Sequence, residues 1–391
     1  MISSDQFTRT LLFSGLLALS LSIGASTVMA SIFGKSELSG VWKERFLDVK
    51  KLNEYTSKGL MIEFSEVTIK GYTLEGAVFN NAVFSNVDWT DVKTLNLSFS
   101  NTVFRGNKFT STSTDNSTFT SATFKNVTFE DSEFDNISFY LSTLTGVKFI
   151  RCKFINKTDF ASLINSNIEF DHSTFNNVGF AKAHAAISFR NSTLNDVELT
   201  SLIFPSTLIF ENTKLEDVGM SRSKLAKLVM DKVTGGGRSG FNGGSVADVE
   251  VNNSEMKFAL NDGNLGKVSF VNSIIIGGFA NSNIKTFKIT NCKGMKGLGL
   301  YQAKIDNLEI SNCSVNNIDF VEAILQNVSI EKSPIVNSEF MDMKVKNFTL
   351  TDVSFDQKID FTGAQVEHLI IKNVTKLPGL NLNLTGSNVK F

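Results

Sequence analysis

Cysteine and histidine, which most often supply nucleophiles and metal ligands, are scarce in this chain of 391 residues, with three of each. Cys292 and Cys313 stand 21 residues apart. The repeat described below places them in adjacent turns, with Cys152 at the equivalent position farther away. Side chains stacked in this way point in parallel directions, which strains a disulfide. We therefore expect each cysteine to replace serine in a tight corner, with a redox role as the alternative.

The remaining polar residues form no catalytic motif. His172, His184 and His368 fall at different places in the repeat, so they should not converge on a metal ion. The sequence has no nucleophile elbow, phosphate-binding Gly-Lys-Ser/Thr loop or two-histidine helix motif. Acidic residues are scattered along the outer positions, which leaves a paired-carboxylate glycosidase site open. We predict that the protein is not an enzyme and has no cofactor and no metal site.

Glycine marks one stretch for a role in binding. Residues 234–300 hold 13 of the 27 glycines, including the segment GGGRSGFNGG at 235–244. Glycine in a strand often marks a bulge or the close approach of another backbone, and it also permits the positive φ that tight corners need. One interpretation is a loosened side of the fold. The other is a flattened docking surface made by Arg238, Phe241, Lys293, Lys296 and Tyr301.

Charge and composition exclude several classes of protein. The chain has 38 Lys and Arg against 39 Asp and Glu, which gives a net charge of -1. It therefore has no overall positive electrostatic field that would attract nucleic acid or an anionic membrane. Three cysteines are too few for a disulfide-built scaffold. With only three prolines and 35 phenylalanines, the composition indicates a regular structure rich in strand.

A five-residue repeat organises the chain from residue 74 onward. Neither a helix nor a flat strand has this period. In most repeats a small or β-branched residue lies two positions before the large one. The large apolar residues are Leu74, Phe79, Phe84, Trp89, Phe99, Phe104, Phe109, Phe119, Phe124, Phe129, Phe134, Phe139, Leu144, Phe149 and Phe154.

A longer period lies over the short one. Thirteen apolar-x-apolar tripeptides such as Val127-Thr128-Phe129, with Asn107, Leu228 and Phe287 filling the gaps, give sixteen starts that are 19, 20 or 21 residues apart, so four five-residue sides make one turn. A fixed period of this kind is typical of a solenoid, in which each turn buries its apolar side chains by stacking on its neighbours. Five residues after each start from 87 onward stands a small residue: Val92, Thr112, Ser132, Cys152, Ser173, Ser192, Thr213, Val233, Ser254, Ser273, Cys292, Cys313, Ser333, Val353 and Val374.

The segments AVFNN, AVFSN, ATFKN and STFTS, between 77 and 126, resemble the pentapeptide-repeat proteins. The resemblance extends over roughly 67–375 and implies an all-β fold, a right-handed four-sided β-helix of about sixteen turns. One departure is that the family favours Asp or Asn just before the central residue, where this chain has Val, Thr, Lys, Ser or Glu. The rival fold is a three-sided β-helix, whose turns are longer and lack a five-residue subperiod.

The ends of the chain differ from the repeats. Residues 1–30 have a positive start, an apolar run at 11–25 and a small-x-small site at Val28-Met29-Ala30, which together predict a secretory signal peptide. A retained membrane anchor is the alternative, although the apolar run is short for a span. We expect an N-terminal cap over 31–66, helical within 38–55, because open β edges need covers. Residues 376–391 should form a C-terminal cap or tail, or a homodimer contact at that end.

The sequence outlines a function without naming a ligand. We expect an exported, non-enzymatic solenoid that acts as a binding scaffold in the periplasm or outside a bacterial cell. Its partner would be a protein or an envelope macromolecule, with no nucleic acid and no stable membrane insertion after signal removal. The resemblance includes DNA mimics and delivered effectors, but a fold does not determine a function. A secreted host-directed effector or a carbohydrate-acting protein is the alternative.

Overall fold

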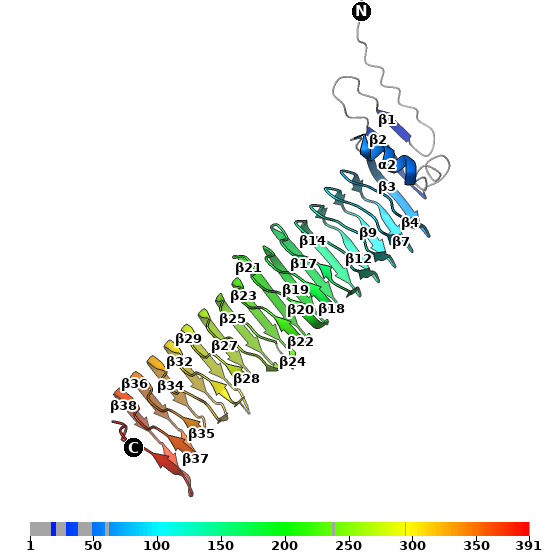
Figure 1. Ribbon diagram of the computed structural model, residues 1–391. Helices are drawn as coiled ribbons and strands as arrows, with labels where there is room; N and C mark the ends of the chain where they lie inside the picture. The colour runs from blue at the N-terminus through cyan, green and yellow to red at the C-terminus, as the bar shows by residue number, and fades with distance from the viewer. Residues whose placement is uncertain are drawn as a thin grey trace, which may run out of the picture. The chain divides into compact units, whose positions relative to one another are not determined.

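The computed structural model describes residues 17–20, 29–37, 49–58, 62–236, 239–293 and 295–390. The chain divides into two compact units, Met1–Thr193 and Leu194–Phe391, which are described separately. Both units are built of short parallel strands wound as a β-solenoid (Figure 1), and the described residues make about sixteen turns. The predicted all-β solenoid and its number of turns are therefore confirmed.

The first unit begins with irregular elements and continues as regular turns. Its elements are β1 (Leu17–Ser20), β2 (Met29–Glu37), α2 (Val49–Ser57), β3 (Ile62–Lys70), β4 (Thr73–Glu75), β5 (Val83–Ser85), β6 (Asp88–Thr90), β7 (Lys93–Leu95), β8 (Val103–Arg105), β9 (Lys108–Thr110), β10 (Ser113–Asp115), β11 (Thr123–Lys125), β12 (Thr128–Glu130), β13 (Glu133–Asp135), β14 (Thr143–Ile150), β15 (Lys153–Ile155), β16 (Thr158–Asp159), β17 (Ser166–Asp171), β18 (Thr174–Gly179) and β19 (Ala185–Arg190).

Strand register in this unit follows the long period of the sequence. Phe84 of β5 pairs with Phe104 of β8, which pairs with Phe124 of β11, all in parallel. The strands β6, β9 and β12 form a second side and β4, β7, β10 and β13 a third. Isolated parallel bridges that run from Val78 through Ser98 and Thr118 to Ser138 mark the fourth. Each turn thus has four sides, as the five-residue subperiod predicts.

The corners explain why asparagine recurs in the sequence. Asn86, Asn126 and Asn136 each lie at a corner between two sides, with φ of 53°, 54° and 51°. This left-handed conformation is strained for most side chains, but glycine, asparagine and aspartate tolerate it. Gly106 and Gly146 occupy the same kind of corner, with φ of 62° and 64°. The chain can therefore turn sharply between short strands without a longer loop.

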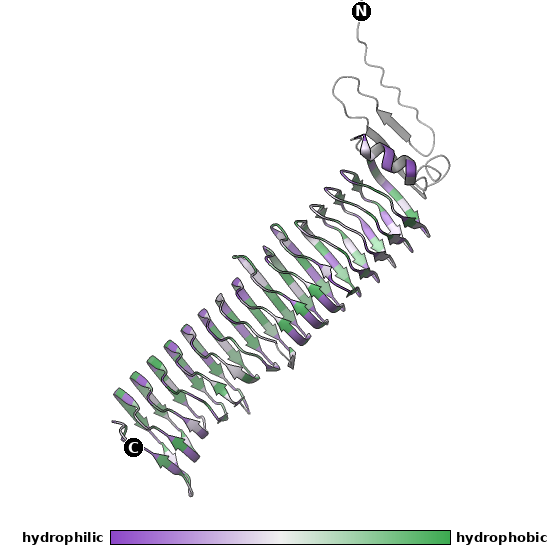
Figure 2. Cartoon of the chain, in the orientation of Figure 1, coloured by the Kyte–Doolittle hydropathy of each residue, from purple (hydrophilic) through white to green (hydrophobic). Residues whose placement is uncertain are grey.

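The core of the first unit is a set of stacked phenylalanine columns. Ring centroids lie 5.2 Å apart for Phe84 and Phe104 and 4.7 Å apart for Phe104 and Phe124, with nearly parallel planes. Rings of neighbouring columns meet edge to face, as for Phe119 and Phe124 at 5.5 Å. Both geometries suit the quadrupole of an aromatic ring. Apolar and polar residues alternate along each short strand accordingly (Figure 2).

The second unit has longer strands. Its elements are β20 (Thr193–Glu198), β21 (Ser206–Glu211), β22 (Lys214–Gly219), β23 (Lys224–Asp231), β24 (Thr234–Gly236), β25 (Ser245–Asn252), β26 (Glu255–Lys257), β27 (Asn264–Val271), β28 (Ile274–Gly278), β29 (Asn283–Thr290), β30 (Met295–Lys296), β31 (Leu298–Gly299), β32 (Lys304–Ser311), β33 (Val315–Asn316), β34 (Ile324–Glu331), β35 (Ile335–Glu339), β36 (Lys344–Thr351), β37 (Ser354–Asp360), β38 (Gln365–Lys372), β39 (Thr375–Lys376) and β40 (Asn381–Asn383).

In this unit an eight-residue strand such as β29 contributes to two successive sides of a turn. The pairing of β29, β32, β34 and β36 is parallel and in register, so that Phe287, Leu308, Val328 and Phe348 stack in one buried column. The columns are mainly aliphatic here, although Phe320, Phe340 and Phe361 form a ring stack like those of the first unit. Each column is buried only by the turns before and after it, as a solenoid requires.

At each end of the chain, part of what the sequence predicts stays untested. The strand β1 pairs with β2 antiparallel, and β2 pairs with β3 in parallel. Most of the predicted signal peptide lies outside the described residues, as do residues 38–48 and 59–61 of the predicted N-terminal cap, so both predictions stay untested. Within the described part of the chain, α2 is the α-helix, and no helix there has the length and apolarity to cross a bilayer.

At the C-terminal end, the strand β40 pairs with β37, and the side chain of Asn388 exchanges two hydrogen bonds of 2.8 Å with the backbone of Val366. The residues of the predicted C-terminal tail thus stack in parallel on the preceding turn. A homodimer formed through this end stays a prediction.

The ring stacks predict where stability resides in the first unit. Phe129 lies 4.5 Å from Phe109 and 4.8 Å from Phe149 between ring centroids and is fully enclosed. Replacing Phe129 by alanine should lower the free energy of unfolding by about 3–5 kcal/mol, because it leaves a cavity in the column and removes the ring between Phe109 and Phe149. Urea unfolding followed by circular dichroism measures this loss. The control is Tyr140→Ala, which removes a ring that is 42% exposed and should cost less than about 0.5 kcal/mol.

Candidate binding surface

The structure separates the residues of the predicted docking surface. Lys293 and Lys296 are exposed on the same side of one turn, and Tyr301, which is 37% exposed, lies on the next side. Arg238 lies outside the described residues. Phe241 is fully buried, so its place in a docking surface was predicted wrongly. It lies two residues after the buried Ser239. In most repeats a core residue follows a small buried residue at this same distance, so Phe241 belongs to the interior.

The cysteines replace serine in the column of small residues. Ser333 accepts a hydrogen bond of 3.0 Å from the backbone N–H of Cys313 and donates one of 2.7 Å to the carbonyl of Glu331. Cys313 does the same through Sγ, accepting from the N–H of Cys292 at 3.3 Å and donating to Ser311 at 3.1 Å. All three cysteines are free and buried. Their side chains satisfy backbone groups that the corner would otherwise leave unpaired.

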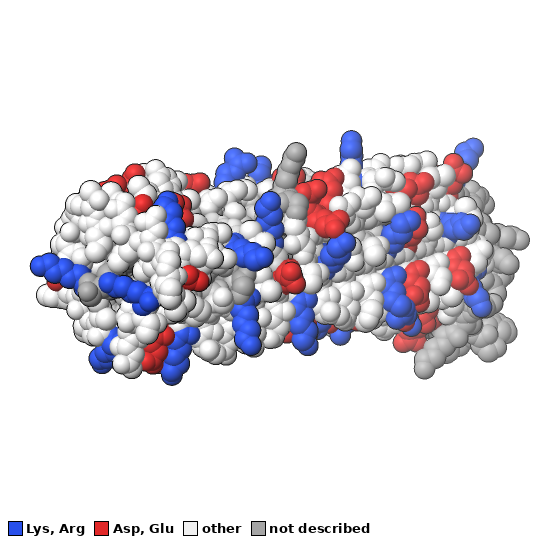
Figure 3. Space-filling model, turned by 90° about the horizontal axis from the view of Figure 1, so that it is seen from below, with Lys and Arg blue, Asp and Glu red and all other residues white. Residues whose placement is uncertain are grey.

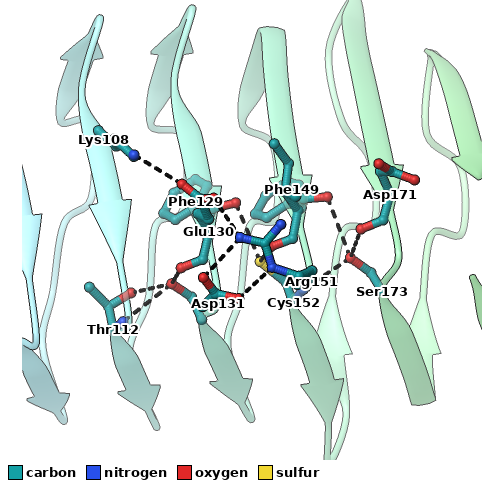
Figure 4. Close-up of polar contacts among 12 residues, drawn as sticks. Lys108, Thr112, Phe129, Glu130, Asp131, Phe149, Arg151, Cys152, Asp171 and Ser173 are labelled. Atoms are coloured by element: carbon teal, nitrogen blue, oxygen red, sulfur yellow. Dashed lines mark hydrogen bonds and ion pairs between the residues drawn. The ribbon is translucent and has the colours of Figure 1, made fainter.

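Charged residues in the first unit neutralise one another (Figure 4). The Arg151 guanidinium donates to Asp131 at 2.7 Å and to Glu130 at 2.5 Å, and the Lys108 ammonium lies 2.9 Å from Glu130. These cations lower the pKa of both carboxyl groups, with Lys108 contributing most at Glu130 and Arg151 most at Asp131. Figure 3 shows neighbouring charges of opposite sign at several places on one face. Because the paired charges neutralise one another, they leave little net electrostatic field to attract a charged partner.

One side of the second unit departs from this pattern. It carries exposed lysine and asparagine side chains on consecutive turns, and we call it the lysine–asparagine face. Strand register places Asn283 beside Lys304, Lys304 beside Ile324, and Ile324 beside Lys344. The face comprises the outward residues Asn264, Lys267, Asn283, Lys285, Lys304, Asn307, Gln326, Asn327, Lys344, Lys346 and Asn347.

The asparagines of this face form ladders along the direction of stacking. The Nδ2 group of Asn283 donates to Oδ1 of Asn264 at 2.9 Å. Asn327 donates to Asn307 at 2.9 Å, and Asn347 donates to Asn327 at 2.8 Å. Each amide thereby has a set orientation. Asn307 and Asn327 also donate to the backbone carbonyls of Lys285 and Asp306, at 3.4 Å each. The capacity left over, chiefly for accepting at Oδ1, can serve a partner without reorganisation.

The lysines of the face are free of carboxylate partners. Elsewhere in this unit the ammonium groups of Lys214, Lys288 and Lys332 lie 2.8, 3.2 and 2.9 Å from a glutamate. Among the described residues, no carboxylate oxygen lies within 4.0 Å of the ammonium group of any lysine on the face.

Acidic residues do lie near the face: Asp248 pairs in register with Lys267, Asp306 and Glu309 lie on the same strand as Lys304, and Glu367 lines a groove with Lys346. None of them forms an ion pair with a lysine of the face, and lysines outnumber carboxylates on it, so the face carries a net positive charge.

A shallow groove of about 320 Å³ opens at one end of the face. Lys344, Lys346, Gln326 and Asn388 line it with cationic and amide groups, Glu367 adds a carboxylate, and Ile324, which is 43% exposed, adds an apolar patch. The groove thus combines two cations and one anion with amide and aliphatic groups. This combination suits a ligand that has both anionic and hydroxyl groups and an apolar ring face.

Known proteins resemble this chain in fold alone. No protein-family model and no curated protein matches it. It is similar to the solved structure of QnrB1, a plasmid-mediated fluoroquinolone resistance protein, with 12% identity over 40% of this chain and 73% of that one and a TM-score of 0.24. HetL, a pentapeptide repeat protein of the cyanobacterium Nostoc, has 9% identity over 86% and 96% and a TM-score of 0.16. A mannuronic acid specific lyase from human gut microbiota has 8% identity over 90% and 91% and a TM-score of 0.27.

The family resemblance drawn from the sequence agrees with the structure itself. Five-residue sides, four to a turn and stacked in parallel, make the four-sided β-solenoid that the sequence predicted. The register of the turns carries this conclusion, and the activities of the similar proteins add nothing to it.

Burial predicts the reactivity of one thiol. Desolvation raises the pKa of Cys152 to about 12, so the neutral thiol is favoured in the folded state. In a variant with Cys292→Ser and Cys313→Ser, Cys152 should not react with an aromatic disulfide reagent at pH 8 until guanidinium unfolds the chain. Its contribution to stability should be complete below the ordinary thiol pKa and should be lost as the pH rises toward 12. Rapid labelling of the native variant at pH 8 would contradict this burial.

Proposed function

We propose that the protein is exported and acts as a non-enzymatic binding scaffold in the periplasm or outside the cell. The observation that carries the proposal is the alignment of outward side chains into rows by strand register, above all on the lysine–asparagine face. Such rows present the same kind of group at every turn, about 4.8 Å apart. A surface of this kind suits an extended partner better than a small substrate.

The distribution of reactive groups supports binding over catalysis. Among the residues that the structure describes, no three His, Cys, Asp or Glu side chains gather as a metal site would need. The thiols are buried, and the adjacent carboxylates Glu130 and Asp131 are held in ion pairs with cations. A general acid requires a raised carboxyl pKa, whereas the pKa of each of these two is lowered.

Export can be tested directly in a bacterial host. The full chain should appear outside the cytoplasm, shortened to begin at Ser31, because residues 1–30 carry the signal pattern. A chain without residues 1–30 should stay in the cytoplasm. Fractionation with N-terminal sequencing measures both. An unprocessed full chain that stays in the cytoplasm would rule out export.

Binding and catalysis are separated by one screen. The purified protein is incubated with polysaccharides and with solubilised envelope material, and both capture and chemical change are measured. We expect capture without turnover. Release of shortened, unsaturated or epimerised sugars would refute the non-enzymatic role and favour a carbohydrate-acting protein. Failure to capture any envelope component would refute the scaffold.

A further inference from the structure

We propose that the lysine–asparagine face binds a linear acidic polysaccharide of uronic acid residues, with the polymer lying along the stacking direction. The inference rests on the proposed scaffold function and names its partner class. The unpaired ammonium groups of Lys267, Lys285 and Lys304 would meet carboxylates. Asn307 and Asn327, already oriented by their ladder, would meet ring hydroxyls.

The spacing of the face suits a polymer of sugar rings. Consecutive turns repeat about every 4.8 Å, which is close to the length that one pyranose ring adds to an extended chain. Lysine recurs on most turns from Lys267 to Lys346, so the carboxylates on the side of the polymer that faces the protein can approach ammonium groups. Where lysine is absent, the exposed Ile324 lies in register between Lys304 and Lys344. Its side chain can contact the apolar face of a ring.

The face is too narrow for a membrane. The corner that leads into it carries Asp262, Glu322 and Asp342, each at a positive φ of 52–57°. Asp319 and Glu339 pair side by side on the side before that corner. A flat anionic bilayer would bring these carboxylates against its own charge. A single polymer chain on the lysine–asparagine face avoids them.

The same face lacks what single-stranded nucleic acid needs. Bound bases stack on aromatic side chains, and base stacking supplies much of the affinity of such proteins. In the described strands that make up this face, no phenylalanine, tyrosine or tryptophan points outward. Its neutral polar groups are amides, which pair well with hydroxyl groups.

The test measures binding of the intact protein to polygalacturonate, with its methyl-esterified form as the probe of equal shape without charge. Titration calorimetry should show binding to the acid form that weakens as salt rises, and little binding to the ester. The triple variant K285Q/K304Q/K344Q should bind about tenfold or more weakly, because it removes three unpaired charges from one face.

A matched variant separates the face from overall charge. K182Q/K232Q/K257Q removes the same number of charges from exposed lysines that belong neither to this face nor to the docking surface predicted from the sequence, and should bind within about twofold of the unchanged protein. Circular dichroism and thermal unfolding should be unaltered in both variants, because all six side chains are exposed. Equal loss in both variants would overturn the assignment to this face.

Other probes decide between partner classes. Tighter binding to single-stranded DNA or to vesicles of anionic phospholipid than to polygalacturonate would overturn the inference, as would equal binding of the acid and ester forms. If K285Q/K304Q/K344Q still captures its envelope component as the unchanged protein does, the scaffold function stands and the polysaccharide assignment fails. If the unchanged protein captures nothing, the scaffold function itself fails.

Discussion

The structure depends on in-register stacking of parallel turns. A side chain at one position of a turn contacts the side chain at the same position of the next, so each position must repeat its size as well as its polarity. The first unit meets this requirement with rings such as Phe104 and Phe124, whose centroids are 4.7 Å apart. The second unit meets it with aliphatic columns such as the one that holds Leu308 and Val328. Both solutions bury apolar area that no single turn could bury alone.

The corners add a polar requirement to the apolar one. Each turn bends sharply at residues with positive φ, and the neighbouring small residue must reconnect the backbone groups that the bend leaves unpaired. A hydroxyl accepts from the preceding turn and donates within its own, as Ser333 does. A thiol can do the same at longer distances, which explains why Cys313 occupies this column without any chemistry of its own.

The register that builds the core also arranges the surface. Each outward residue lies beside an outward residue of the next turn. Its charge either forms an ion pair, as that of Arg151 does with Asp131, or stays without one, as the charges of the lysines on the lysine–asparagine face do. Accumulated like charge costs folding free energy unless a ligand compensates it. The row of lysines without ion pairs beside oriented amides is the observation on which the proposed partner rests.

The sequence by itself determined the fold class, the length of a turn, the core columns and the serine-like role of the cysteines, because each of these follows from spacing within one or two neighbouring turns. It placed Phe241 on the surface, although the Ser239–Phe241 spacing matched the core pattern; the run of glycines obscured that match. Only the tertiary structure revealed the lysine–asparagine face. Lys285 follows its core residue Ile284 whereas Lys304 precedes Ile305, so no fixed sequence period relates the two lysines. Strand register alone brings them to one side, because side chains on both flanks of an inward residue point outward.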